Sequence, residues 1–147
     1  MKNASSTKPR ILIVDDDHDF TSDMKVFLSS DFEIDIASGT REAKRLLNDL
    51  TPECILLDMH MPEYLGDNPE MEGIFFLDSI TEQHGDSFIS AVPVLILSSF
   101  TKELTDRTHY LSIIDGLYEK PPNIDTLKQA IWEAISQRRK GNTKTVN

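Results

Sequence analysis

The sequence predicts an α/β fold in which a five-stranded parallel sheet carries helices on both faces. Two observations predict it. Five short apolar runs alternate along the chain with five segments whose apolar residues recur at helical spacing. This alternation is typical of parallel strands joined by right-handed helical crossovers. In addition, three of the apolar runs end in an acidic or hydroxyl residue, and such residues meet at one edge of a parallel sheet.

In the first half of the chain the expected order is strand, helix, strand, helix, strand. The ranges are 10–15, 17–29, 33–37, 40–50 and 53–58. The first strand is a continuous apolar run, as in a strand buried on both faces. Asp17 or Asp19 can cap the first helix and Thr40 the second, because their side-chain oxygens accept hydrogen bonds from free N–H groups. Pro52 ends the second helix. The apolar residues of the first helix recur at helical spacing, namely Phe20, Met24, Phe27 and Leu28.

In the second half the expected order is helix, strand, helix, strand, helix. The ranges are 73–84, 92–98, 102–111, 113–119 and 125–139. Residues 59–72 are expected to be a loop, because they are rich in proline, glycine and acids. Residues 1–9 and 140–147 are polar and are expected to be a flexible lead-in and tail. One domain over residues 10–139 remains.

The composition restricts the classes of function. The net charge of −10 argues against direct binding of nucleic acid or of an anionic membrane, because both need a basic surface. No apolar run approaches the ~20 residues of a membrane-spanning helix, and residues 1–9 lack an apolar signal core. The single cysteine, Cys54, lies in an apolar strand and is expected to be a small buried hydrophobe. We therefore expect a cytoplasmic protein without membrane insertion.

Polar residues at the ends of four expected strands form the candidate site. Asp15 and Asp16 follow the first strand, Asp58 ends the third, Ser98 ends the fourth and Lys120 follows the fifth. Alone, each has an ordinary interpretation as a solvated loop, helix cap, turn or surface residue. Together, and in this order, they predict a Mg²⁺-dependent phosphoryl site. Mg²⁺ prefers carboxylate oxygens, an aspartate can accept a phosphoryl group, and a lysine and a hydroxyl can bind its oxygens.

The chain resembles the receiver domain of bacterial two-component response regulators over residues 9–138. The motifs that carry the resemblance are Val14-Asp15-Asp16, Asp58-Met59-His60-Met61-Pro62 with Glu72-Gly73, Ser98-Ser99 and Lys120-Pro121. The resemblance implies the flavodoxin-like, doubly wound (βα)5 form of the α/β fold. It also implies a phosphoacceptor switch rather than an enzyme, with catalysis limited to its own phosphorylation and dephosphorylation.

The resemblance also assigns roles and partners. Asp58 accepts a phosphoryl group from a sensor histidine kinase or a histidine phosphotransfer protein. Asp16 and Asp58 ligate Mg²⁺ with the main-chain carbonyl of His60, while Asp15 acts largely through water. Ser98 and Lys120 contact the phosphoryl group. Phosphorylation then shifts the population toward a form with altered protein contacts, and an unidentified downstream protein reads that change.

Three features depart from the family pattern. An aromatic residue commonly stands three positions before the lysine, where this chain has Leu117, and Tyr118 follows on the opposite strand face. Residues 63–69 look like an insertion beside the site, either a tolerated surface loop or a lid. Ser99 occupies a position where a small apolar residue is common.

Three functions therefore stay open. The leading hypothesis is a single-domain response regulator that signals through protein contacts, relays phosphate or drains it from a kinase. The alternative is a phosphorylation-independent interaction module with the same fold, for which Leu117 is a weak argument. A phosphatase of the haloacid-dehalogenase type would use Asp15 and Asp17, but it would leave the residues from Asp58 to Pro62 without a role.

Overall fold

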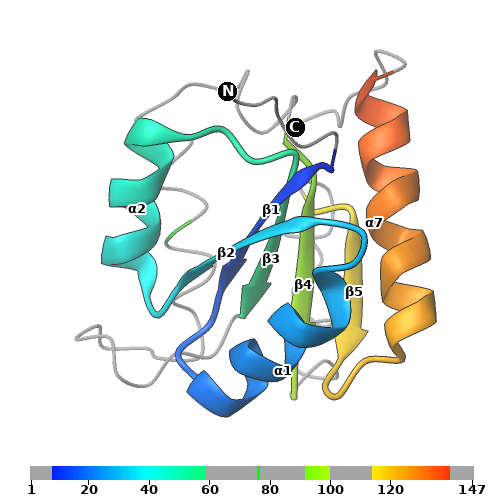
Figure 1. The fold of residues 1–147 in the computed structure, drawn as a ribbon, viewed down its shortest axis with the longest axis horizontal. Coiled ribbons are helices and arrows are strands. Elements are labelled where there is room, and N and C mark those ends of the chain that lie inside the picture. The colour runs from blue at the N-terminus through cyan, green and yellow to red at the C-terminus, as the bar shows by residue number, and fades with distance from the viewer. Residues whose placement is uncertain (1–7, 59–75, 77–91, 100–113, 140–147) are drawn as a thin grey trace.

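The computed structural model describes residues 8–58, 76, 92–99 and 114–139 (Figure 1). The elements, in chain order, are β1 (Arg10–Val14), α1 (His18–Leu28), β2 (Glu33–Ala37), α2 (Thr40–Asp49), β3 (Cys54–Asp58), β4 (Val94–Ser98), β5 (Gly116–Glu119) and α7 (Ile124–Arg139). Each lies within a few residues of its expected range. The helices expected over 73–84 and 102–111 and the loop over 59–72 fall outside the described residues, except Phe76, which is helical.

The five strands form one parallel sheet in the order β2-β1-β3-β4-β5. β1 is therefore paired on both sides, with Ile13 opposite Ile36 of β2 and Leu56 of β3. The chain runs outward from β1 to β2 and then returns past β1 to β3. The connections that follow β1 and β3 therefore lead to opposite sides of the sheet. The carboxyl ends of two such neighbouring strands form a switch point, where ligands bind in open α/β sheets. The predicted doubly wound fold is confirmed.

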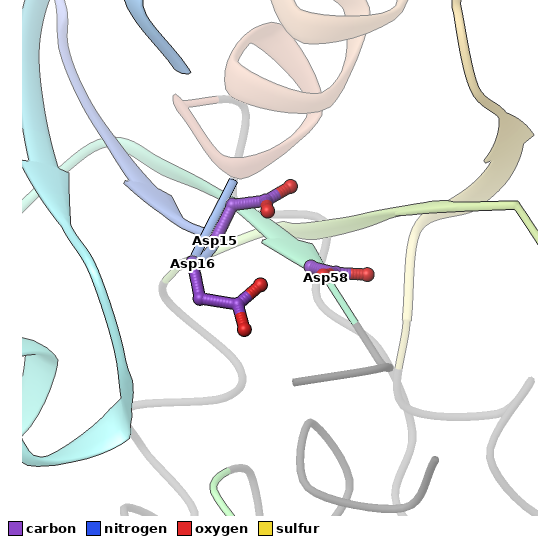
Figure 2. A group of neighbouring side chains, drawn as sticks. All are labelled: Asp15, Asp16 and Asp58. Carbon is purple, nitrogen blue, oxygen red and sulfur yellow. The ribbon is translucent and has the colours of Figure 1, made fainter. Parts of the chain in front are cut away.

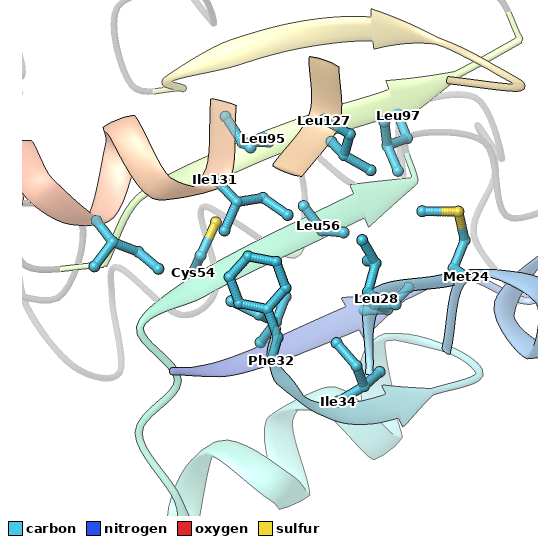
Figure 3. Close-up of a cluster of buried hydrophobic side chains, with 13 residues drawn as sticks. Met24, Leu28, Phe32, Ile34, Cys54, Leu56, Leu95, Leu97, Leu127 and Ile131 are labelled. Carbon is cyan, nitrogen blue, oxygen red and sulfur yellow. The ribbon is translucent and has the colours of Figure 1, made fainter. Parts of the chain in front are cut away.

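Apolar side chains cover both faces of the sheet, which explains why the central strands are continuous apolar runs. On one face Met24 and Leu28 of α1 and Leu127 and Ile131 of α7 pack against the strands, around Leu56 (Figure 3). The other face carries α2 and Phe76. Its buried cluster includes Ala43, Leu47, Phe76, Leu12, Ile55 and Ile96. The two layers therefore bury both faces of the sheet.

Two local expectations are corrected. Thr40 does not cap α2, because Gly39 is the N-cap and Thr40 is the first helical residue. Glu42 reaches back instead and accepts a hydrogen bond from the Ser38 main-chain N–H at 2.8 Å. Phe27, which shares the helical spacing of the apolar residues of α1, is 50% exposed, because α1 buries only a narrow stripe against the sheet.

Leu117 and Tyr118 lie on opposite faces of β5, as predicted. Leu117 packs against the cluster on the α2 side, and Tyr118 packs against the cluster on the α7 side. The Tyr118 ring folds back over Gly116, where an added Cβ would come within 2.7 Å of Tyr118 Cε2. The aromatic ring of β5 is therefore on the α7 side of the sheet, and glycine at position 116 leaves room for it.

A buried ion pair lies at the amino ends of β4 and β5. Arg138 of α7 lies 3.0 Å from the Asp115 carboxylate, just before β5, and both side chains are nine-tenths buried. Asp115 also accepts a hydrogen bond from the Val94 main-chain N–H at 3.0 Å. Burial, with a smaller contribution from Asp115, raises the pKa of the Cys54 thiol, which is fully buried as expected. None of the described helices is long and apolar enough to cross a membrane.

Candidate functional site

Three carboxylates meet at the switch point between β1 and β3. Asp15 and Asp16 directly follow β1, and Asp58 is the last residue of β3 (Figure 2). One oxygen from each lies within 4.8 Å of the others. Asp15 is 3% and Asp58 5% exposed, whereas Asp16 is half-buried. The sequence prediction that these three residues converge is confirmed, because parallel pairing of β1 with β3 brings their carboxyl ends together.

Local hydrogen bonds fix the turn that carries the acid pair. The Asp15 main-chain N–H donates to the Ala37 carbonyl at the end of β2, at 3.0 Å. The Asp15 carboxylate in turn accepts from the Asp17 N–H at 3.0 Å. The Asp17 carboxylate then accepts from the Phe20 N–H, so that Asp17, rather than Asp19, caps α1. The turn therefore holds Asp15 in a buried position, whereas Asp16 stays half-buried.

Lys120 brings a positive charge to the cluster from the end of β5. Its Nζ lies 2.6 Å from Asp15 Oδ2 and 3.6 Å from Asp58 Oδ2. The side chain is 14% exposed, and the main-chain N–H of Lys120 donates to the Ser98 carbonyl at 3.0 Å. The predicted site lysine is thus placed between two of the three carboxylates, with its tighter contact to Asp15.

Ser98 is placed at the same edge of the sheet and is almost fully buried. Its neighbour Leu97 is the register partner of Asp58, so Ser98 lies one residue beyond the phosphoacceptor candidate along the adjacent strand. Ser99 is exposed. His60 and the 63–69 segment lie outside the described residues, and the role of the His60 carbonyl stays a prediction.

The carboxylate cluster fits a hard divalent cation. Three carboxylates this close repel one another, and within the described part of the chain only Lys120 offsets that charge. Both oxygens of Asp15 are engaged, with the Asp17 N–H and with Lys120. No hydrogen bond or ion pair occupies the Asp16 carboxylate among the residues described here. Asp16 could therefore hold a cation directly, beside Asp58, whereas Asp15 could act through water.

Burial dominates the titration of Asp15. It raises the pKa of this carboxyl above the ordinary value of 3.8, while Lys120 and the Asp17 N–H oppose the rise and Asp16 adds to it. A group whose pKa is raised on folding stabilises the fold at low pH. That contribution is lost as the pH rises through the folded-state pKa. Without a bound cation, the charged Asp15 carboxylate therefore lowers the free energy of unfolding at neutral pH.

We accordingly expect the stability of the cation-free protein to depend on Asp15. From about pH 4 to about pH 7 in EDTA, the unfolding free energy of the wild type should fall relative to that of Asp15→Asn. At neutral pH, Mg²⁺ at about 100 times its Kd should stabilise the wild type by about 2.7 kcal/mol. Urea titrations at each pH measure both effects. A wild type that gains stability over Asp15→Asn as the pH rises would contradict this account.

The fold and the site together define a doubly wound α/β protein with an acidic centre at its switch point. The family model of the response regulator receiver domain matches residues 11–132. The chain belongs to this family. Receiver domains are phosphoacceptor switches that bind Mg²⁺ at an acidic pocket, take phosphoryl groups from histidine kinases and signal to effector domains. Because the chain belongs to this family, the alternative of a phosphatase of the haloacid-dehalogenase type is no longer needed.

Curated relatives share the domain but are longer. A protein-glutamate methylesterase/protein-glutamine glutaminase of Rhodopseudomonas palustris is 35% identical over 137 residues, which cover 90% of this chain and 34% of that protein. The transcriptional regulatory protein PrrA of Mycobacterium tuberculosis is 30% identical over 141 residues, which cover 95% and 54%. The chain thus spans between about a third and about half of the length of these relatives.

Solved structures support the fold. The receiver domain of the Francisella response regulator 1452 matches with a TM-score of 0.70 and 24% identity, over 88% of this chain and 98% of that one. A CheY-like receiver domain protein from Methanospirillum hungatei JF-1 matches with a TM-score of 0.73 and 21% identity, over 92% and 99%.

One residue at the site was not anticipated from the sequence. The Phe20 ring lies against Lys120, with Nζ 4.5 Å from the ring centroid. Helical spacing predicts only that Phe20 lies on the apolar face of the first helix. The available signal was its position three residues after Asp17, which fixes it in the first turn of a helix that begins beside the acid pair.

Proposed function

We propose that the chain is a Mg²⁺-dependent phosphorylation switch in which Asp58 accepts a phosphoryl group from a sensor histidine kinase or a histidine phosphotransfer protein. One observation carries the proposal: the Asp58 carboxylate ends a central strand beside Asp15 and Asp16, with the Lys120 ammonium 3.6 Å away. A nucleophilic carboxylate, a cation-binding acid pair and a positive charge are the groups that phosphoryl transfer requires.

In the proposed reaction an Asp58 oxygen attacks phosphorus in line with the bond to the donor histidine. The new O–P bond forms as the N–P bond breaks, and the imidazole leaves with the electron pair. Asp16, Asp58 and the His60 carbonyl would hold Mg²⁺, and the cation would supply positive charge against the phosphoryl oxygens. Lys120 and Ser98 bind phosphoryl oxygens. Water later attacks the acyl phosphate, releases inorganic phosphate and restores the Asp58 carboxylate.

The proposed output is a change in protein contacts. Lys120 and Ser98 belong to the ends of β5 and β4, and the Lys120 N–H is bonded to the Ser98 carbonyl. A phosphoryl group that binds both residues stabilises one arrangement of these two strands over another. In this proposal the chain acts as a regulator in the cytoplasm, and its partners are the phosphoryl donor and a downstream protein. The methylesterase and transcriptional activities are named only for the longer relatives.

Intact-mass spectrometry with acetyl phosphate tests the proposal. The wild type should gain one phosphoryl group in the presence of Mg²⁺ and none in EDTA. The matched variant Asp58→Asn should gain none in either buffer, because the amide is not a nucleophile. A folded wild type that gains no phosphoryl group would favour the phosphorylation-independent interaction module. An Asp58→Asn variant that is phosphorylated like the wild type would contradict the assignment of the acceptor.

A further inference from the structure

The Lys120 ammonium has three described neighbours. Two are the carboxylates of Asp15 and Asp58. The third is the ring of Phe20, whose centroid lies 4.5 Å from Nζ. A cation at this distance over an aromatic face is attracted by the negative charge of the ring face, and the attraction is stronger where water is displaced. The Lys120 side chain is largely withdrawn from water, at 14% exposed.

The contact between Phe20 and Lys120 completes a closed cycle of interactions beside the acid pair, Asp15 and Asp16. The Asp15 carboxylate accepts from the Asp17 N–H, and the Asp17 carboxylate caps α1 at the Phe20 N–H. The Phe20 ring contacts the Lys120 ammonium, which pairs with the Asp15 carboxylate. The carboxylate that binds the lysine thus also fixes the helical turn that carries the ring. Phe20 is therefore held in place by the site it contacts.

Lysine needs such a constraint more than most side chains. Its ammonium is a compact charge on a flexible four-carbon stem. With Asp15 at 2.6 Å and Asp58 at 3.6 Å, an unconstrained ammonium would follow the nearer carboxylate. The Phe20 ring supplies a further attraction, so that Nζ has three neighbours to satisfy rather than one carboxylate to follow.

We propose that Phe20 is a positioning residue that holds the Lys120 ammonium beside Asp58, ready to bind a phosphoryl oxygen. The benefit to phosphoryl transfer rests on the proposed function, whereas the placement of the ammonium over the ring does not.

The rate of phosphorylation by acetyl phosphate at saturating Mg²⁺ tests the role in transfer. Loss of the contact in Phe20→Leu should slow transfer roughly 3- to 30-fold. Phe20→Tyr keeps an aromatic face and should stay within about twofold of the wild type. Phe27→Leu is the matched control, because it makes the same change on the same helix at a half-exposed position. A Phe20→Leu rate equal to that of Phe27→Leu would overturn the proposal.

A second variant keeps the proposal testable if Phe20→Leu does not fold. Pentafluorophenylalanine at position 20 keeps the shape of the ring but removes the negative charge of its face. We expect it to slow transfer as Phe20→Leu does. Transfer at the wild-type rate would show that the ring acts only by packing and would overturn the proposal.

NMR of the Lys120 ε-methylene group tests the placement without any phosphoryl transfer. A ring face shields nearby protons, so these protons should resonate upfield in the wild type and Phe20→Tyr, and near their ordinary position in Phe20→Leu. Lys120→Met assigns the signal. An unshifted wild-type signal would overturn the proposal. A shifted signal in a protein that never takes up phosphate would instead refute the proposed function and leave the placement of Lys120 standing.

Discussion

Replacement of Arg138 by methionine is expected to lower the free energy of unfolding by about 3–5 kcal/mol. Methionine fills most of the space of the aliphatic part of arginine, so the loss arises from charge rather than from a cavity. The Asp115 carboxylate would stay buried with the Val94 N–H as its one remaining hydrogen-bond partner among the described residues. A buried carboxylate that loses its counter-ion retains the full cost of its removal from water.

Arg10→Met is the matched control for this prediction. Arg10 and Asp35 form a shorter ion pair, at 2.7 Å, but their side chains are 44% and 27% exposed. Exposed pairs contribute about 1 kcal/mol or less, so Arg10→Met should have little effect. The double variant Asp115→Asn/Arg138→Met should recover part of the loss, because neither charge remains. Urea unfolding measures all three, and equal losses for Arg138→Met and Arg10→Met would contradict the account.

Lys120→Met is expected to slow phosphorylation by acetyl phosphate roughly 10²- to 10³-fold. Lys120 is the one described cation within ion-pair distance of Asp58, and charge develops on the phosphoryl oxygens as the transfer proceeds. The substitution also leaves the buried Asp15 carboxylate without its counter-ion. The acceptor and its neighbour would then repel the incoming phosphoryl donor more strongly.

The rate is measured by intact mass against time at saturating Mg²⁺. Lys120→Arg keeps the charge but not the compact shape of the ammonium, and it should be slowed less than Lys120→Met. Lys128→Met serves as a surface control, since Lys128 pairs with Asp31 on the outside of the molecule. Phosphorylation of Lys120→Met within a few-fold of the wild type would exclude Lys120 from the transfer step.

The fold and the acid cluster were predictable because both depend on short-range patterns. Continuous apolar runs mark strands buried on both faces, and the alternation of strands with helices requires a parallel sheet. Asp15 and Asp16 directly follow β1 and Asp58 ends β3, so parallel pairing of these two strands brings the three residues together. The same logic places Lys120 at the sheet edge, but it does not indicate which carboxylate the ammonium contacts.

The contacts that escaped prediction join distant segments. The Phe20–Lys120 contact depends on how α1 lies against the end of β5, which no local pattern specifies. Arg138 and Asp115 are 23 residues apart and read as ordinary surface charges in the sequence. The exposure of Phe27 likewise depends on the width of the stripe that α1 buries, which is a property of packing rather than of spacing.

Identification of the phosphorylated residue tests the central claim most directly. The wild type is incubated with acetyl phosphate and Mg²⁺ and then reduced with borohydride, which converts an acyl phosphate on aspartate into homoserine. Peptide mapping then locates the change. The account predicts homoserine at position 58 alone, and only in samples that contained Mg²⁺. Modification at Asp15 or Asp16, or at position 58 without Mg²⁺, would contradict it.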